Sequence, residues 1–172
     1  MKIAITGHTT GIGKAIFDRY PDAIGFSRAT GYDIDLYGHR VRIARESKDC
    51  DVFINNAYYD NAQIELLYEL TKEFKGHIIN ISSNSADGIK KNKRRYPVYK
   101  AALDKASEQL FYKGFNVTNV RPGYVDTPRI KDVTETKMSP EYIADIVDWI
   151  IKQPHRVKDI TVCPTINTTK GV

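Results

Sequence analysis

The arrangement that most constrains the fold of this chain is a cluster of glycines between a short apolar segment and an amphipathic one. Residues 2–6 (KIAIT) predict a strand, and residues 11–19 (GIGKAIFDR) predict the helix that follows. In such a turn Gly7 allows the chain to reverse tightly, Gly11 lets the backbone approach a pyrophosphate, and Gly13 lets helix and strand pack closely. The helix N-terminus also offers free N–H groups to phosphate. Alone the cluster is a weak signal, because glycine-rich turns are common.

The rest of the chain continues this alternation of strands and helices. Further strands are predicted over residues 23–27, 32–36, 51–55, 77–82, 115–120 and 159–163, and helices over residues 37–48, 62–74, 97–112 and 139–152. Strands separated by helices imply right-handed βαβ units and a parallel sheet that is covered on both faces. We therefore predict an α/β protein: one doubly wound Rossmann domain over residues 1–172, with a mostly parallel seven-stranded sheet and a loose tail from residue 164.

Composition argues against several classes of protein. Charged residues make up 27% of the 172 positions and hydrophobic residues 41%, which is typical of a globular chain. No apolar run approaches the ~18 residues of a membrane span, and the N-terminus lacks a signal-peptide pattern, so we expect a cytoplasmic protein. Two cysteines and four scattered histidines have no metal-binding spacing. The net charge of +5, without interleaved aromatic residues beside the basic run, does not predict nucleic-acid binding.

A second group of residues has the spacing needed for acid–base chemistry. Tyr96 and Lys100 are four residues apart, so on a helix they share one face. A free tyrosine titrates near ~10, and a nearby ammonium group would lower that pKa and let Tyr96 exchange a proton near neutral pH. The hydroxyl of Ser83, at the end of a predicted strand, would hold the substrate oxygen. Tyr99 competes for the tyrosine role but has Leu103, not lysine, four residues on.

Taken together, these patterns resemble the short-chain dehydrogenase/reductase family, of which this chain would be an unusually short member. The stretch from Thr6 to Gly13 resembles the family's TGxxxGIG motif, and residues 78–83 (IINISS) resemble its strand that ends in a serine pair. The second serine of that pair is usually the catalytic one. Tyr96 lies thirteen residues beyond Ser83, which is the usual separation in the family.

The resemblance also assigns residues to a bound dinucleotide. Residues 55–57 (NNA) resemble the family's Asn-Asn-Ala-Gly turn, with Tyr58 in place of the glycine, and residues 120–127 resemble its Pro-Gly-x-x-x-Thr loop. Asp35-Leu36 resembles the pair that contacts adenine, and Asp33-Ile34 is a rival alignment. The residues expected at the cofactor are Gly7, His8, Thr9, Thr10, Gly11, Ile12, Gly13, Arg28, Asp35, Leu36, Asn56, Ala57, Tyr96, Lys100, Pro122, Gly123, Val125 and Thr127.

Arg28 bears on which dinucleotide is used. It follows the second predicted strand, where an acid would bind the ribose hydroxyls of NAD(H) and an arginine can accommodate the 2′-phosphate of NADP(H). The sequence therefore favours NADP(H) over NAD(H). The alternative is an arginine that only faces solvent.

Asn61 is a candidate for a fourth catalytic residue. The resemblance places an asparagine early in the helix before the serine strand, where it helps to organise a proton-relay water. Asn61 lies 22 residues before Ser83, near the expected separation. It is equally compatible with a helix N-cap.

The function that the resemblance implies is an NAD(P)H-dependent oxidoreductase, a carbonyl reductase or alcohol dehydrogenase. In it Tyr96 is the acid/base, Lys100 lowers the pKa of Tyr96 and holds ribose, and Ser83 orients the carbonyl. The alternative is an NADP(H)-binding redox sensor without turnover. It is motivated by the short segment between residues 127 and 139, which in the family forms much of the substrate lid.

The sequence leaves the substrate and the oligomeric state open. The basic run at residues 90–95 (KKNKRR) either attracts an anionic small molecule or is a solvated loop, and we favour the solvated loop. The helices predicted at residues 62–74 and 97–112 correspond to those that pair subunits in many relatives, so a homo-oligomer remains compatible with the sequence.

Overall fold

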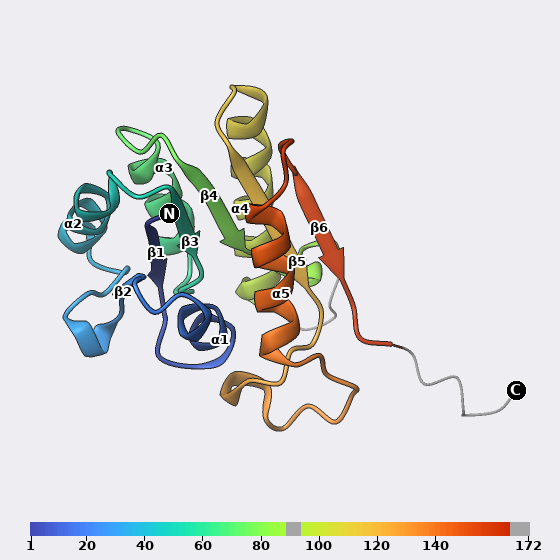
Figure 1. Ribbon diagram of the computed structural model, residues 1–172. Coiled ribbons are helices and arrows are strands. Elements are labelled where there is room, and N and C mark those ends of the chain that lie inside the picture. Colours follow the sequence, from blue (N-terminus) through green and yellow to red (C-terminus); the bar gives the residue numbers. More distant parts are fainter. Residues whose placement is uncertain (89–93, 166–172) are drawn as a thin grey trace, which may run out of the picture.

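Six strands form a single parallel sheet in the computed structural model, which describes residues 1–88 and 94–165 (Figure 1). The strands are β1 (Ile3–Thr6), β2 (Ile24–Phe26), β3 (Val52–Asn55), β4 (His77–Ile81), β5 (Val117–Pro122) and β6 (Asp159–Val162). Their order across the sheet is β2-β1-β3-β4-β5-β6, and every neighbouring pair is parallel. The chain changes direction across the sheet between β1 and β3. In open α/β sheets ligands bind at such a switch point, outside the carboxyl ends of the strands.

Five helices cover the two faces of this sheet. They are α1 (Gly11–Arg19), α2 (Tyr37–Ser47), α3 (Ala62–Leu70), α4 (Arg95–Tyr112) and α5 (Pro140–Ile151), with short 3₁₀ turns η1 (Arg28–Thr30), η2 (Asn84–Asp87) and η3 (Pro128–Ile130). Helices α1 and α5 pack against each other, whereas α2, α3 and α4 form the other layer (Figure 1). None of the described helices has both the length and the apolar composition needed to cross a bilayer.

Alternate residues of the central strands supply the two cores. Ala4 and Phe53 point into the core under α2, α3 and α4, whereas Ile5 and Ile54 point into the core under α1 and α5. Each of these four side chains is fully buried. A parallel strand that is buried on both faces reads as a continuous apolar run, which explains why the segments IAIT and VFIN could be recognised from the sequence.

The prediction of a seventh strand over residues 32–36 is wrong. The segment YDIDL alternates apolar and polar residues as a strand does, but it forms a turn. The Asp33 carboxylate accepts a hydrogen bond from the Asp35 N–H (3.0 Å), and the Asp33 N–H donates to Nδ1 of His39 (2.9 Å). The Leu36 N–H donates to the carbonyl of Asp33 (3.1 Å). An aspartate that binds the backbone two residues on stabilises a turn, so β2 is the edge of the sheet.

The six remaining strand predictions and the five helix predictions are confirmed, with shifted ends. The helix predicted over residues 62–74 ends at Leu70, and the helix predicted from residue 97 begins at Arg95, with Pro97 in its first turn. Proline is tolerated there because the first N–H groups of a helix have no partner within it. Residues 90–93 of the basic run and residues 166–172 of the predicted tail lie outside the described residues.

Candidate active site

The turn between β1 and α1 has a backbone that requires glycine. Gly7 and Gly11 have φ angles of +71° and +55°, in the left-handed region that glycine enters without steric cost. A Cβ on Gly13 would lie 2.1 Å from the Gly7 carbonyl oxygen, because α1 and the turn approach closely there. A Cβ on Gly11 would lie 3.0 Å from Cγ2 of Thr127. The turn therefore faces the loop that follows β5.

Two polar side chains hold this turn in place. The Thr6 hydroxyl oxygen accepts hydrogen bonds from the N–H groups of Asn56 and Ala57, both at 3.0 Å. The Asn56 amide donates in return to the carbonyls of Thr6 (3.0 Å) and Gly7 (3.1 Å). The residues after β3 thus fix the residues after β1, on the two sides of the switch point.

The first turn of α1 fits a phosphate group. Thr10, at the N-cap, makes no side-chain capping hydrogen bond, and the first turn carries no acidic residue. The N–H groups and the positive dipole end of the helix are therefore available to an anion. Thr9 and Thr10 are exposed, whereas the His8 ring packs 4.7 Å from the Phe17 ring, between the centroids.

The residues predicted to meet the adenosine end lie on the β2 side of this turn. Arg28 begins η1, directly beyond β2, and is exposed. Asp35 and Leu36 are also exposed, in the turn that precedes α2, where Arg40 donates to the Asp35 carbonyl (2.8 Å). Position and exposure are compatible with a cofactor contact at all three residues.

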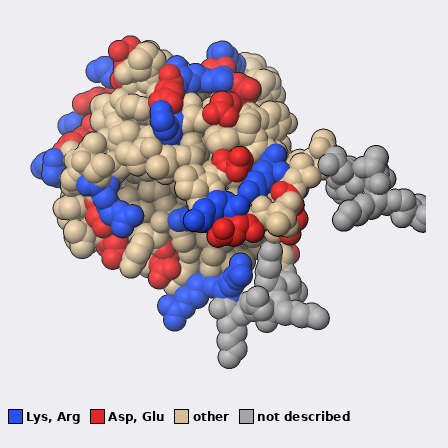
Figure 2. Space-filling model, turned by 90° about the horizontal axis from the view of Figure 1, so that it is seen from below, with Lys and Arg blue, Asp and Glu red and all other residues tan. Residues whose placement is uncertain are grey.

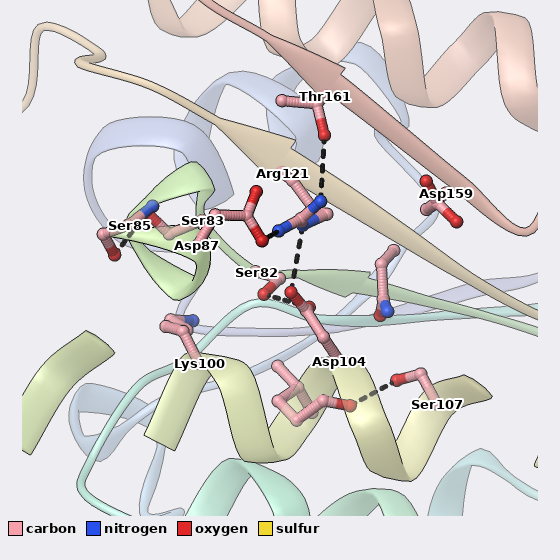
Figure 3. A network of polar contacts seen from close by, with 12 residues as sticks. Ser82, Ser83, Ser85, Asp87, Lys100, Asp104, Ser107, Arg121, Asp159 and Thr161 are labelled. Carbon is pink, nitrogen blue, oxygen red and sulfur yellow. Dashed lines mark hydrogen bonds and ion pairs between the residues drawn. The ribbon is translucent and has the colours of Figure 1, made fainter. Parts of the chain in front are cut away.

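Ser83 lies two residues beyond the end of β4, at the N-cap of η2, and is buried. Its hydroxyl oxygen accepts hydrogen bonds from the Ser85 N–H (3.2 Å) and the Ser85 hydroxyl (2.9 Å) (Figure 3). The Ser83 hydroxyl also donates to the Pro122 carbonyl (3.5 Å). Tyr96 lies in the first turn of α4, close to Ser83. Hydrogen bonding with Ser83 lowers the pKa of Tyr96. Burial has the larger effect, and the pKa of Tyr96 is raised overall.

Lys100 is enclosed beneath the ring of Tyr96. Its ammonium donates to Oε1 of Gln63 (2.7 Å) and to the Ile81 carbonyl (2.8 Å), and it lies 5.5 Å from the centroid of the Tyr96 ring. Burial and, to a smaller extent, the positive charge of Arg129 lower the pKa of Lys100 to about 7, against the opposing effect of Asp104.

This arrangement corrects the expectation that Lys100 lowers the pKa of Tyr96. The groups that lower it are Ser83 and Arg129, and burial outweighs both. The physical reason is that the two acceptors of Lys100, Gln63 and the Ile81 carbonyl, hold its ammonium below the ring rather than at the hydroxyl. Burial also favours the neutral amine, which weakens its field.

The structure does not bring Asn61 to the other three catalytic candidates. Asn61 precedes α3, is exposed and makes no side-chain capping hydrogen bond. Gln63, two residues on, is buried and contacts Lys100 instead, while its Nε2 donates to the Asn55 carbonyl (2.6 Å) and the Ile81 carbonyl (3.2 Å). The signal for Gln63 was present in the sequence as a polar residue on the otherwise apolar face of a predicted helix.

Two further residues at the site were missed. The Tyr58 ring makes an edge-on contact with the Tyr96 ring, with 4.8 Å between the centroids. The Arg129 guanidinium carbon lies 4.9 Å from the centroid of the Tyr58 ring. The departure from the family motif at position 58 was the one available signal for this cluster.

The loop after β5 joins the two halves of the site. A Cβ on Gly123 would lie 3.3 Å from Nδ2 of Asn84, beside the serine, and Thr127 lies against Gly11. Val125 is buried between these points and forms a bridge with Met138. The predicted loop residues therefore run from the end of β4 to the glycine turn.

A partly buried ion-pair network supports α4 behind the catalytic candidates (Figure 3). Arg121 of β5 pairs with Asp104 (2.9 Å) and Asp87 (2.5 Å), and the Ser82 hydroxyl donates to Asp104 (2.5 Å). Asp104 is one turn beyond Lys100 on α4. The network ties this helix to β4 and β5, which keeps Tyr96 and Lys100 in register with Ser83.

The stability of the protein is expected to depend on pH through Lys100. Its pKa is about 7 when folded and near the ordinary 10.5 when unfolded, so in this range the unfolded chain binds the extra proton. Raising the pH then raises the free energy of unfolding. Relative to Lys100→Met, the wild type should gain on the order of a few kcal/mol between about pH 7 and pH 10. Urea unfolding at several pH values measures this, and a difference that is independent of pH would contradict it.

Figure 2 shows the face of the molecule toward which β4 and β6 point in Figure 1. Lysine, arginine and acidic side chains are interspersed on the described part of this face, around surface that carries neither charge. The surface is thus mixed in sign, which suits a local site for a small ligand better than a broad electrostatic footprint.

The chain is similar in sequence to curated oxidoreductases and in fold to solved dehydrogenase and reductase structures. No family model matches the chain. An uncharacterized oxidoreductase of Staphylococcus haemolyticus is 28% identical over 149 residues, which cover 76% of this chain and 64% of that protein. The chain spans between 46% and 64% of the length of the first curated relatives that it matches.

Solved structures match over nearly the whole chain. A 3-ketoacyl-(acyl-carrier-protein) reductase from Brucella melitensis, complexed with NADH, has a TM-score of 0.79 at 14% identity, covering 94% of this chain and 96% of that one. A short chain dehydrogenase from Burkholderia cenocepacia, in complex with NADP, has a TM-score of 0.76 at 18% identity, covering 96% and 88%. At such identities the likeness shows a common fold.

Proposed function

Because this chain has the fold of the short-chain dehydrogenases and reductases, we propose that it is an NAD(P)H-dependent oxidoreductase that interconverts a carbonyl and a hydroxyl group. The observation that carries the proposal is the cluster of Ser83, Tyr96 and Lys100 at the carboxyl end of β4, joined by one loop to the glycine turn after β1. The proposed proton donor Tyr96, the proposed partner of the substrate oxygen Ser83, and the turn that would bind the phosphates then belong to one site, as such a reaction requires.

The glycine turn and the N-terminus of α1 would hold the pyrophosphate, with Thr127 opposite. The bound nicotinamide supplies or accepts the hydride. This chain's own residues would handle the proton and the oxygen: in reduction the Tyr96 hydroxyl gives its proton to the carbonyl oxygen as hydride reaches the carbon, and Ser83 binds the same oxygen. The pKa of Tyr96 is raised by burial, so the hydroxyl is protonated at neutral pH and suited to donate.

The cofactor is proposed to be NADP(H) rather than NAD(H), on the basis of Arg28. We expect Arg28→Gln to lower kcat/KM for NADPH by about 10- to 100-fold, since charge-assisted hydrogen bonds to a phosphate contribute roughly 1.5–3 kcal/mol. kcat/KM for NADH should stay within about twofold. Steady-state kinetics with both cofactors measures this, and Arg45→Gln, on the exposed end of α2, is the matched control. An equal loss for both cofactors would exclude this role.

The proposed activity is tested by NADPH and NADH oxidation across a panel of aldehydes and ketones, in parallel with cofactor binding by calorimetry. Turnover of any carbonyl compound supports the oxidoreductase. Tight cofactor binding with no turnover on the whole panel would instead favour a redox sensor.

A further inference from the structure

Tyr58 and Arg129 form a pair beside the proposed proton donor. They come from separate segments: Tyr58 follows β3, and Arg129 lies in η3, two residues beyond Thr127. The Arg129 guanidinium lies over the Tyr58 ring at 4.9 Å, and that ring contacts the Tyr96 ring with 4.8 Å between centroids. The cation is thus one aromatic ring away from Tyr96.

The charge of Arg129 reaches the reacting groups. Burial has the largest effect on the pKa values of Tyr96, Tyr58 and Lys100, and the positive charge of Arg129 lowers all three. Lys100 is the other cation at the rings, but its ammonium is buried against Gln63 and the Ile81 carbonyl. Arg129 is exposed, and among the described residues no carboxylate forms a salt bridge with it.

A guanidinium that stacks on a ring keeps its N–H edges free. It can therefore bind a carboxylate through two parallel hydrogen bonds while the ring fixes its plane. Ammonium groups lack this planar fork. A ligand whose carbonyl group is held at Tyr96 would reach the Arg129 guanidinium with a carboxylate that is only a few bonds from that carbonyl.

Resting on the proposed function, we propose that Arg129, seated on Tyr58, binds the carboxylate of the substrate. The substrates are then small oxo acids or hydroxy acids rather than neutral carbonyl compounds. Arg129 determines specificity in this arrangement, and Tyr58 positions it.

The test compares acids with their neutral esters. The probes are pyruvate, acetoacetate and levulinate, in which the carboxylate is progressively farther from the ketone, together with their methyl esters. The wild type should prefer at least one acid over its ester. Arg129→Gln should lower kcat/KM for that acid by about 10- to 100-fold and for the ester by less than about threefold. Arg129→Lys should restore part of the loss, and Lys131→Gln, an exposed cation in the same segment, should leave the preference unchanged.

Tyr58 gives a second, independent pair of variants. Tyr58→Leu removes the ring under the guanidinium and should weaken the acid preference, whereas Tyr58→Phe keeps the ring and should retain it. Three outcomes overturn the proposal: no acid preference in the wild type, equal losses for acid and ester in Arg129→Gln, or a loss confined to the KM for the cofactor. The last would assign Arg129 to a cofactor phosphate.

Failure of the proposed function would look different. In that case the wild type binds cofactor but turns over none of the probes. The anion site is then tested by calorimetric titration of the same three acids into cofactor-loaded protein. Binding of an acid that weakens at least about tenfold in Arg129→Gln supports the site, and binding that is absent or unaffected overturns it.

Discussion

Replacing Tyr96 with phenylalanine is expected to lower kcat for carbonyl reduction by about 10²- to 10⁴-fold, the range that general acid catalysis contributes. The change removes one hydroxyl and keeps the ring that packs against Tyr58. Cofactor affinity should stay within about twofold, because the glycine turn and α1 are untouched. Single-turnover oxidation of bound NAD(P)H measures the chemical step, and fluorescence titration measures the affinity.

Tyr99→Phe is the matched control, since Tyr99 lies three residues further along α4 and is the rival for the tyrosine role. It should keep at least about half of the wild-type activity. Unchanged turnover in Tyr96→Phe, or a comparable loss in Tyr99→Phe, would remove Tyr96 from the role of acid and with it the chemistry proposed for this site.

The parts of the fold that could be predicted are those set by short-range patterns. Strands such as Ile3–Thr6 are buried on both faces and read as apolar runs, and Ser139-Pro140 marks the start of α5 by a capping serine that accepts the Tyr142 N–H (3.1 Å). Alternation failed at residues 32–36 because the side chains of Asp33 and His39 offered the backbone local partners, and such turn chemistry competes directly with strand pairing. Periodicity alone does not reveal which of the two prevails.

The site could be predicted as a set of residues but not as a set of contacts. Spacing placed Tyr96 and Lys100 on one helix face, and they do share it, but the side-chain acceptor of Lys100, Gln63, comes from a different helix. Gln63 takes that place rather than Asn61 because of how α3 is turned against β3 and β4. Arg129 and Tyr58 meet only through the packing of two loops. Contacts between segments distant in sequence leave no local pattern.

Replacing Gly13 with alanine is expected to be the most damaging single substitution in the nucleotide half of the site. The added Cβ would lie 2.1 Å from the Gly7 carbonyl oxygen and 2.4 Å from Nδ2 of Asn56. Backbone must move to relieve the first contact, and the hydrogen bonds from Asn56 to the turn must break to relieve the second. Overpacking of this kind costs about 1–3 kcal/mol of stability.

The same movement displaces the N–H groups of α1 from the phosphate position, so cofactor affinity should fall by at least about tenfold. Urea unfolding and calorimetric titration with NADPH measure the two effects. Gly38→Ala in α2 is the control: a Cβ there meets nothing within 4 Å, and alanine in a helix should stabilise by up to about 1 kcal/mol without changing affinity. A Gly13→Ala protein that binds NADPH as the wild type does would show that the glycine turn does not carry the cofactor, and the site would then have to be sought elsewhere on the sheet edge.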